Sequence, residues 1–87
     1  MTLKTMIENA IHMGMKTFTV SHYSYNGRKI EQTVDTIFEF IKDYEDCIPV
    51  TCYFGTYYSM SIPHWHYDKP DHCHISYRLP NENLPKE

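Results

Sequence analysis

The chain has 87 residues, a mass of 10.4 kDa and a formal net charge of -3. Hydrophobic residues make up 41% and charged residues 22%, which excludes disordered and collagen-like chains and indicates one small globular domain. No apolar run approaches the roughly 18 residues that a membrane-spanning helix needs, and the N-terminus lacks the pattern of a secretory signal. We therefore expect a cytoplasmic protein without membrane contact, and the acidic balance argues against direct binding to nucleic-acid phosphates.

Residues 2–13 are predicted to form the first helix. Apolar side chains recur there at the spacing i, i+3, i+4, i+7, i+8, which places them on one helical face: Leu3, Met6, Ile7, Ala10 and Ile11. Thr2 or Thr5 can accept hydrogen bonds from the first free amides, and Gly14 permits the left-handed turn that ends many helices.

Residues 17–34 are predicted to form a β-hairpin, because β-branched and aromatic residues surround the turn signal Asn26-Gly27. A three-residue turn over 25–27 would pair Phe18 with Val34 and His22 with Ile30, and it would gather the apolar residues on one side. A two-residue turn would mix the two sides, so the three-residue turn is preferred, although the pattern alone does not fix the register.

A second helix is expected to begin at Asp35 or Thr36, with Thr36 and Glu39 as a capping box. Its apolar positions again follow helical spacing: Ile37, Phe40, Ile41 and Tyr44. The remaining positions are mostly acidic, and Glu39, Asp43 and Asp46 could face a basic partner, although a solvated helix face is the simpler explanation.

Two further strands are expected, over 50–62 and 72–79, where apolar and polar residues alternate. The predicted fold is therefore α+β, in the order helix, strand, strand, helix, strand, strand. In its simplest form it has two layers, a four-stranded antiparallel sheet with both helices packed on one face. Residues 1–79 would form the domain, and the proline-containing residues 80–87 a flexible polar tail.

Eight tyrosines is a high number for this length, and four of them fall on the predicted outer face of the sheet: Tyr23, Tyr25, Tyr53 and Tyr57. Tyrosine is common at protein interfaces because it combines a large apolar ring with a hydroxyl group. This face is a candidate surface for a partner protein or for a homodimer. The alternative is aromatic pairing that only stabilises the sheet.

Four of the six histidines lie within residues 64–74. A hairpin centred on Lys69 would oppose His66 to His72 and His64 to His74, so that four imidazoles share one face and could bind zinc. Since Met60 and Ile62 have the same strand parity as His64, this arrangement requires a bulge near Pro63. The histidines could instead be the polar side of a half-buried hairpin, or a pH-responsive surface.

Three cysteines without C-x-x-C spacing are expected to stay free thiols, and Cys73 between two histidines is a weaker candidate for a nucleophile. No phosphate-binding or dinucleotide-binding glycine motif is present. The favoured function is a small non-enzymatic binding protein of the inhibitor or adaptor type, a profile shared with proteins of phages and mobile elements. The alternative is a zinc protein, structural or hydrolytic, that uses His64, His66, His72 and His74.

Overall fold

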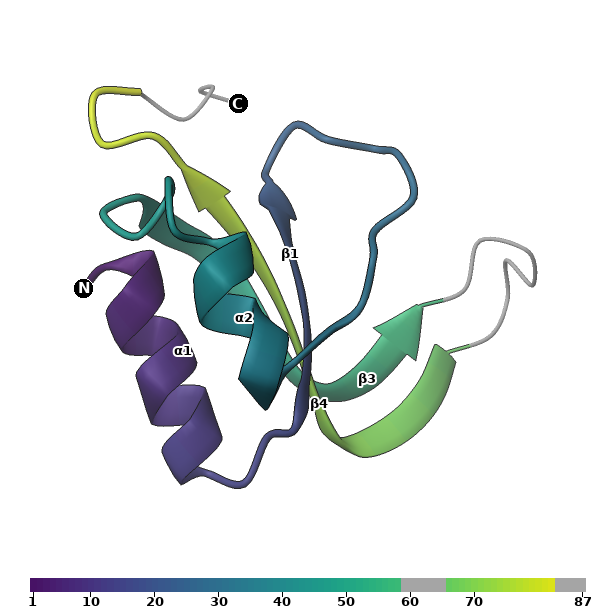
Figure 1. Cartoon of the computed structure of the whole chain (residues 1–87). Coiled ribbons are helices and arrows are strands. Elements are labelled where there is room, and N and C mark those ends of the chain that lie inside the picture. Colours follow the sequence, from purple (N-terminus) through teal and green to yellow (C-terminus); the bar gives the residue numbers. More distant parts are fainter. Residues whose placement is uncertain (59–65, 83–87) are drawn as a thin grey trace.

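A computed structural model describes residues 1–58 and 66–82 of the chain, with side chains for 1–55 and 71–82. Six elements follow one another along the chain (Figure 1): α1 (Leu3–His12), β1 (Thr17–His22), β2 (Gln32–Thr33), α2 (Val34–Phe40), β3 (Ile48–Tyr58) and β4 (His66–Arg78). The predicted α+β class and the order of the elements are confirmed. No helix in this part of the chain is long and apolar enough to cross a membrane.

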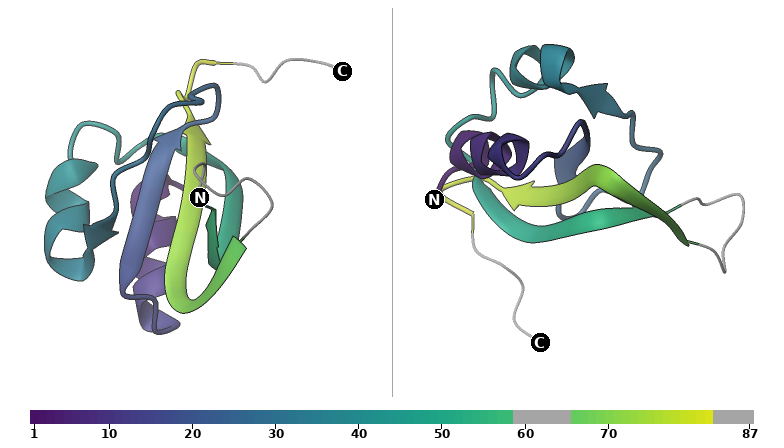
Figure 2. Two further views of the ribbon diagram at one scale, coloured as in Figure 1. Left: turned by 90° about the vertical axis from the view of Figure 1, so that its right-hand side faces the viewer. Right: turned by 90° about the horizontal axis from the view of Figure 1, so that it is seen from below.

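The sheet is mixed, and the prediction of a purely antiparallel sheet is wrong. Its strand order is β2-β1-β4-β3, with β1 parallel to β4 and antiparallel pairs at both edges (Figures 1 and 2). The physical reason is burial: β1 and β4 carry the most buried apolar side chains, so pairing them at the centre covers both. The two-residue strand β2 forms one edge, where a short strand offers few unpaired backbone groups.

One cluster of buried side chains joins the helices to the sheet. Alternate residues of the two central strands contribute Phe18, Val20, Cys73, Ile75 and Tyr77. Leu3, Ile7 and Ala10 of α1 and Ile37 and Ile41 of the α2 segment complete the cluster, together with Cys47. The views in Figures 1 and 2 show α1 and α2 on the same side of the sheet, and the opposite side is called the outer face below.

Helix α1 begins and ends as its sequence predicts. The side chain of Thr2 caps the helix by accepting a hydrogen bond from the backbone N–H of Thr5, at 3.2 Å. At the other end Gly14 has φ +98°, a left-handed conformation that costs glycine little because it has no Cβ atom. Leu3, Ile7 and Ala10 are fully buried, in agreement with the apolar face expected from their spacing.

The tight hairpin over residues 17–34 is not formed. Thr17 pairs with Thr33 and Phe18 with Gln32, so neither the predicted pair Phe18–Val34 nor His22–Ile30 exists. A long connection over 23–31 replaces the short turn, and it leaves Ile30 69% exposed. The turn signal Asn26-Gly27 is local, whereas the two ends of this connection are held by β4: the Tyr23 N–H donates to the Tyr77 carbonyl, and Glu31 approaches His72.

The second helix starts earlier than predicted and is shorter. Thr33 is its N-cap and forms the capping box with Thr36, so the predicted box of Thr36 and Glu39 is wrong. The helix ends at Phe40, and Tyr44 lies in the following turn, where its ring stacks on Tyr77 at 5.5 Å between centroids.

The last two strands also differ from their predicted bounds. β4 starts at His66 rather than at residue 72, and Tyr58 pairs with His66. Register shifts in β3 lie between Pro49 and Thr51 and between Phe54 and Thr56. The bulge expected near Pro63 lies outside the described residues. Within the predicted tail, the Glu82 carboxylate lies 2.8 Å from Nε2 of His22, and the flexible tail stays a prediction for the rest.

Candidate functional site

The outer face of the sheet is polar along its two central strands. Since side chains alternate between the faces of a strand, the residues that alternate with the buried apolar residues point to this side. β1 contributes Thr17, Thr19 and Ser21, β4 contributes His72, His74 and Ser76, and β3 adds Thr51 and Tyr53. The parallel register places each hydroxyl of β1 beside one of these β4 residues: Thr17 beside His72, Thr19 beside His74, and Ser21 beside Ser76.

A buried histidine lies at the centre of a hydrogen-bonded network. His72 is 1% exposed, its Nδ1 lies 2.9 Å from Oγ1 of Thr17, and its Nε2 lies 3.4 Å from Oγ1 of Thr19. The Glu31 carboxylate approaches Nδ1 at 3.5 Å. A buried imidazole needs such partners because an unsatisfied polar group inside a protein is costly.

His74 continues this network toward the surface. Its Nδ1 lies 2.6 Å from the same Thr19 hydroxyl, and its ring stacks on the cross-strand neighbour Tyr53 at 6.4 Å between centroids. Burial lowers the pKa of His74 below the ordinary value of 6.5, and the charges of Lys29 and His72 lower it further. His74 is therefore held in its neutral form over most of the physiological pH range.

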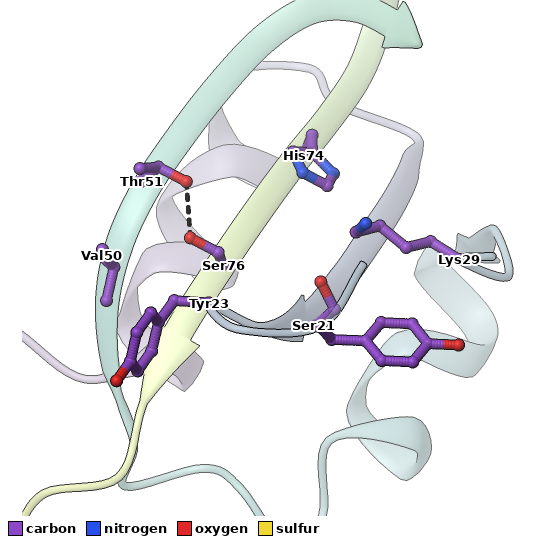
Figure 3. A pocket seen from close by; sticks show the side chains of 8 residues that line it. Ser21, Tyr23, Lys29, Val50, Thr51, His74 and Ser76 are labelled. Carbon is purple, nitrogen blue, oxygen red and sulfur yellow. Dashed lines mark hydrogen bonds between the residues drawn. The ribbon is translucent and has the colours of Figure 1, made fainter. Parts of the chain in front are cut away.

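A groove of about 310 Å³ opens on this face, between the end of β1, the connection over 23–31 and β3 (Figure 3). The residues that line it are Ser21, Tyr23, Tyr25, Lys29, Val50, Thr51, His74 and Ser76. All of them except Val50 carry a hydroxyl group, an ammonium group or an imidazole. The hydroxyls of Thr51 and Ser76 are 2.6 Å apart and are hydrogen-bonded to each other across β3 and β4 (Figure 3).

Glu82 interacts with residues at the Tyr23 end of the groove. Its carboxylate accepts the backbone N–H of Leu79 at 3.0 Å and lies 2.8 Å from Nε2 of His22. These hydrogen bonds lower the pKa of Glu82, and desolvation and the nearby Glu82 charge raise the pKa of Tyr23. The Glu82 carboxylate is thus occupied by partners within the chain.

The predicted four-histidine hairpin has a different geometry. Residues 66–78 form one strand, so His66 does not oppose His72, and His74 pairs with Tyr53. The strand continues through the expected turn around Lys69, and on its N-terminal side Asp68 pairs with Thr56 and Tyr67 with Tyr57 of β3. His64 and the side chain of His66 lie outside the described residues. Among the residues whose side chains are described, no three His, Cys, Asp or Glu lie close enough to hold a metal ion, and zinc binding stays a prediction.

The structure brings three of the four predicted interface tyrosines to the outer face. Tyr23 and Tyr25 line the groove, and Tyr53 is 56% exposed beside His74. The backbone of Tyr57 pairs with Tyr67 in the same strand pair, while its side chain lies outside the described residues. That this face contacts a partner stays a prediction.

The acidic candidates lie elsewhere. Glu39 is on α2, and Asp43 and Asp46 are on the turn that follows; all three are exposed, and none lines the groove. Glu39 is 3.8 Å from Lys42, an exposed ion pair of little energetic weight.

The cysteines are free thiols, and Cys73 lacks the properties of a nucleophile. It is fully buried in the core, and burial raises the pKa of its thiol, whereas a reactive cysteine needs a lowered pKa and access to solvent. The neighbours His72 and His74 point to the other face of the strand. The Sγ atom of Cys73 lies 3.7 Å from Sγ of Cys52.

Sequence reasoning missed the groove residues Lys29 and Ser21 and the central hydroxyl of Thr19. No local signal marks them, because they become neighbours of His74 only through the parallel pairing of β1 with β4 and the path of the 23–31 connection. A comparison of the chain with known protein families, curated proteins and solved structures finds no match.

Proposed function

We propose that this chain is a small non-enzymatic binding protein, of the inhibitor or adaptor type, which contacts another protein through the outer face of its sheet. The observation that carries the proposal is the aromatic surface of this face: Tyr53 is 56% and Tyr25 49% exposed, although the opposite face is packed into a core. Exposed tyrosines beside a polar groove are typical of protein-binding surfaces, since each ring offers apolar area and its hydroxyl stays solvated or hydrogen-bonded.

The state of the potential nucleophiles favours binding over catalysis. Cys73 is buried in the core, and Thr19 is 5% exposed, with its hydroxyl engaged by two imidazoles. A nucleophile has to reach its substrate as well as its general base. The free thiols fit an action in a reducing compartment such as the cytoplasm, which belongs to the same proposal.

Site-specific photo-crosslinking tests the proposal. One variant carries benzoyl-phenylalanine in place of Tyr53 on the outer face, and the matched control carries it in place of Phe40, which is 40% exposed on α2 beside the acidic residues. After irradiation of cells that produce the protein, we expect a discrete covalent adduct from position 53 and none from position 40. Mass spectrometry then identifies the partner.

Two results would overturn the proposal. An adduct from position 40 without one from position 53 would move the interface to the acidic surface of α2. An adduct from position 53 with twice the mass of the chain would show self-association instead of contact with another protein.

A further inference from the structure

The lining of the outer-face groove has a charge opposite to that of the whole chain. The chain has a net charge of -3, yet the one charged side chain among the residues that line the groove is the cation Lys29. A groove lined by one sign of charge attracts ligands of the opposite sign, and its walls reduce the screening by solvent.

Three donor groups from separate elements meet at one end of this groove (Figure 3). Lys29 reaches in from the 23–31 connection, Ser21 from β1 and His74 from β4. The Lys29 ammonium lies 5.6 Å from the centre of the Tyr25 ring, and no carboxylate of the described side chains forms a salt bridge with it. The cation is therefore available to a ligand.

The hydrogen bond between His74 and Thr19 engages one ring nitrogen of His74 and leaves the other open to a ligand. Thr19 has one hydroxyl proton, and its distance to Nδ1 of His74, 2.6 Å, is much shorter than its distance to Nε2 of His72, 3.4 Å. When this hydroxyl donates to Nδ1, the proton of the neutral His74 ring lies on Nε2, and a carboxylate beside Nε2 favours this tautomer. This Nε2–H has no partner among the described residues, so it can donate to a ligand even when His74 is neutral.

We propose that the Ser21, Lys29 and His74 end of the groove binds a carboxylate from an acidic side chain of the partner protein. A carboxylate accepts hydrogen bonds at both oxygens, which matches an ammonium, an imidazole N–H and a hydroxyl in one place. The methylene groups of a glutamate side chain can pack on the Tyr25 ring, which lines the same groove and whose centre is 5.6 Å from the Lys29 ammonium. This inference rests on the proposed function and names the chemistry that the partner presents.

The test uses the whole chain and small probes, so it needs no identified partner. N-acetylglutamate methylamide is titrated into the protein, and the neutral glutamine analogue serves as the matched control. NMR follows the imidazole signals of His74 and the backbone amide of Ser21. We expect saturable shifts of both with the glutamate probe and none with the glutamine probe.

Paired lysine variants locate the binding site. Lys29→Met should weaken binding of the glutamate probe about tenfold, since a charge-assisted contact is lost. Lys4→Met makes the same change of charge on the exposed surface of α1 and should leave the affinity unchanged.

Several results would overturn the inference. Equal shifts with both probes, or equal effects of the two lysine variants, would exclude a carboxylate site at Lys29. Tighter binding of inorganic phosphate would assign the groove to a different anion, and tighter binding of N-acetylglycine would assign it to a chain terminus. If the glutamate probe fails while position 53 still crosslinks to a partner, this inference falls and the proposed function stands. Saturable probe binding without any crosslink at position 53 would support the carboxylate site and count against contact of the outer face with a partner protein.

Discussion

At the scale of single residues, one hydroxyl group on the outer face interacts with two imidazoles. Thr19 is buried and lies between His72 and His74, and the parallel register places it there. His72 is 1% exposed and His74 is only partly buried, so the two histidines have different roles. His72 satisfies the buried part of the network, whereas His74 extends it into the groove.

His72→Ala should therefore destabilise the fold. The substitution removes the imidazole partner of Thr17 and one of the two imidazole partners of Thr19, and it opens a cavity, so we expect a loss of about 1–3 kcal/mol in the free energy of unfolding. Urea unfolding with a chelator present measures this loss without any contribution from metal. His12→Ala, at an exposed position of α1, is the control, and an equal loss in both variants would contradict a buried structural role.

The lowered pKa of His74 predicts a pH dependence of stability. In the folded protein His74 resists protonation because of its burial, Lys29 and His72, and its other close neighbours, Thr19 and Tyr53, carry no charge. The unfolded chain has the ordinary pKa of 6.5 and so binds more protons in mildly acidic solution. The stabilising contribution is thus fully present above pH 6.5 and is lost as the pH falls through the folded pKa.

Urea unfolding between about pH 7.5 and pH 5 measures this dependence. His74→Gln keeps a polar side chain of similar length but cannot titrate, so its stability should change less with pH than that of the original protein. An identical pH dependence in both proteins would show that other groups cause the loss.

At the scale of elements, the end of α1 depends on a left-handed glycine. Gly14 has φ +98°, and an added Cβ atom would meet no atom within 4 Å. A substitution there tests the backbone conformation alone, without a steric clash. Helix α1 is the element that sequence patterns predict best, because its apolar spacing, its Thr2 cap and its Gly14 end are all local.

Gly14→Ala should lower the free energy of unfolding by about 1 kcal/mol, because alanine adopts the left-handed conformation reluctantly. Gly14→Asn should cost less, since asparagine tolerates this conformation better than other residues with a side chain. Thermal or urea unfolding of the two variants checks the order. If asparagine costs as much as alanine or more, the conformation is not the cause.

At the scale of the whole molecule, the two faces of the sheet differ in burial. The inner face holds fully buried Ile75 within the core, and the outer face leaves Tyr53 largely exposed. A side chain that is mostly exposed contributes little to the stability of the free protein.

Truncating one residue on each face measures this division. Ile75→Ala should lower the free energy of unfolding by about 2–5 kcal/mol, through lost burial and a cavity in the core. Tyr53→Ala should lower it by less than about 1 kcal/mol, because the ring is mostly exposed and loses only its stacking on His74. A comparable loss from both variants would mean that the outer tyrosines stabilise the sheet and would count against their role as a binding surface.

The sequence by itself determined the local features of this protein: the α+β class, the order of the elements, the ends of α1, and the alternation that buries Phe18, Cys73 and Ile75. It also indicated the exposed position of Tyr53. Each of these follows from residues that are close along the chain, where helical or strand periodicity and capping act directly.

Only the tertiary structure decided the strand order and the site. The parallel pairing of β1 with β4 joins residues more than 50 positions apart, and local patterns cannot choose it over a sequential antiparallel sheet. That pairing brings Thr19 to both histidines, and the path of the 23–31 connection adds Lys29 to the groove. Long-range pairing is selected by the total burial of apolar surface, which is a property of the whole chain and not of any segment.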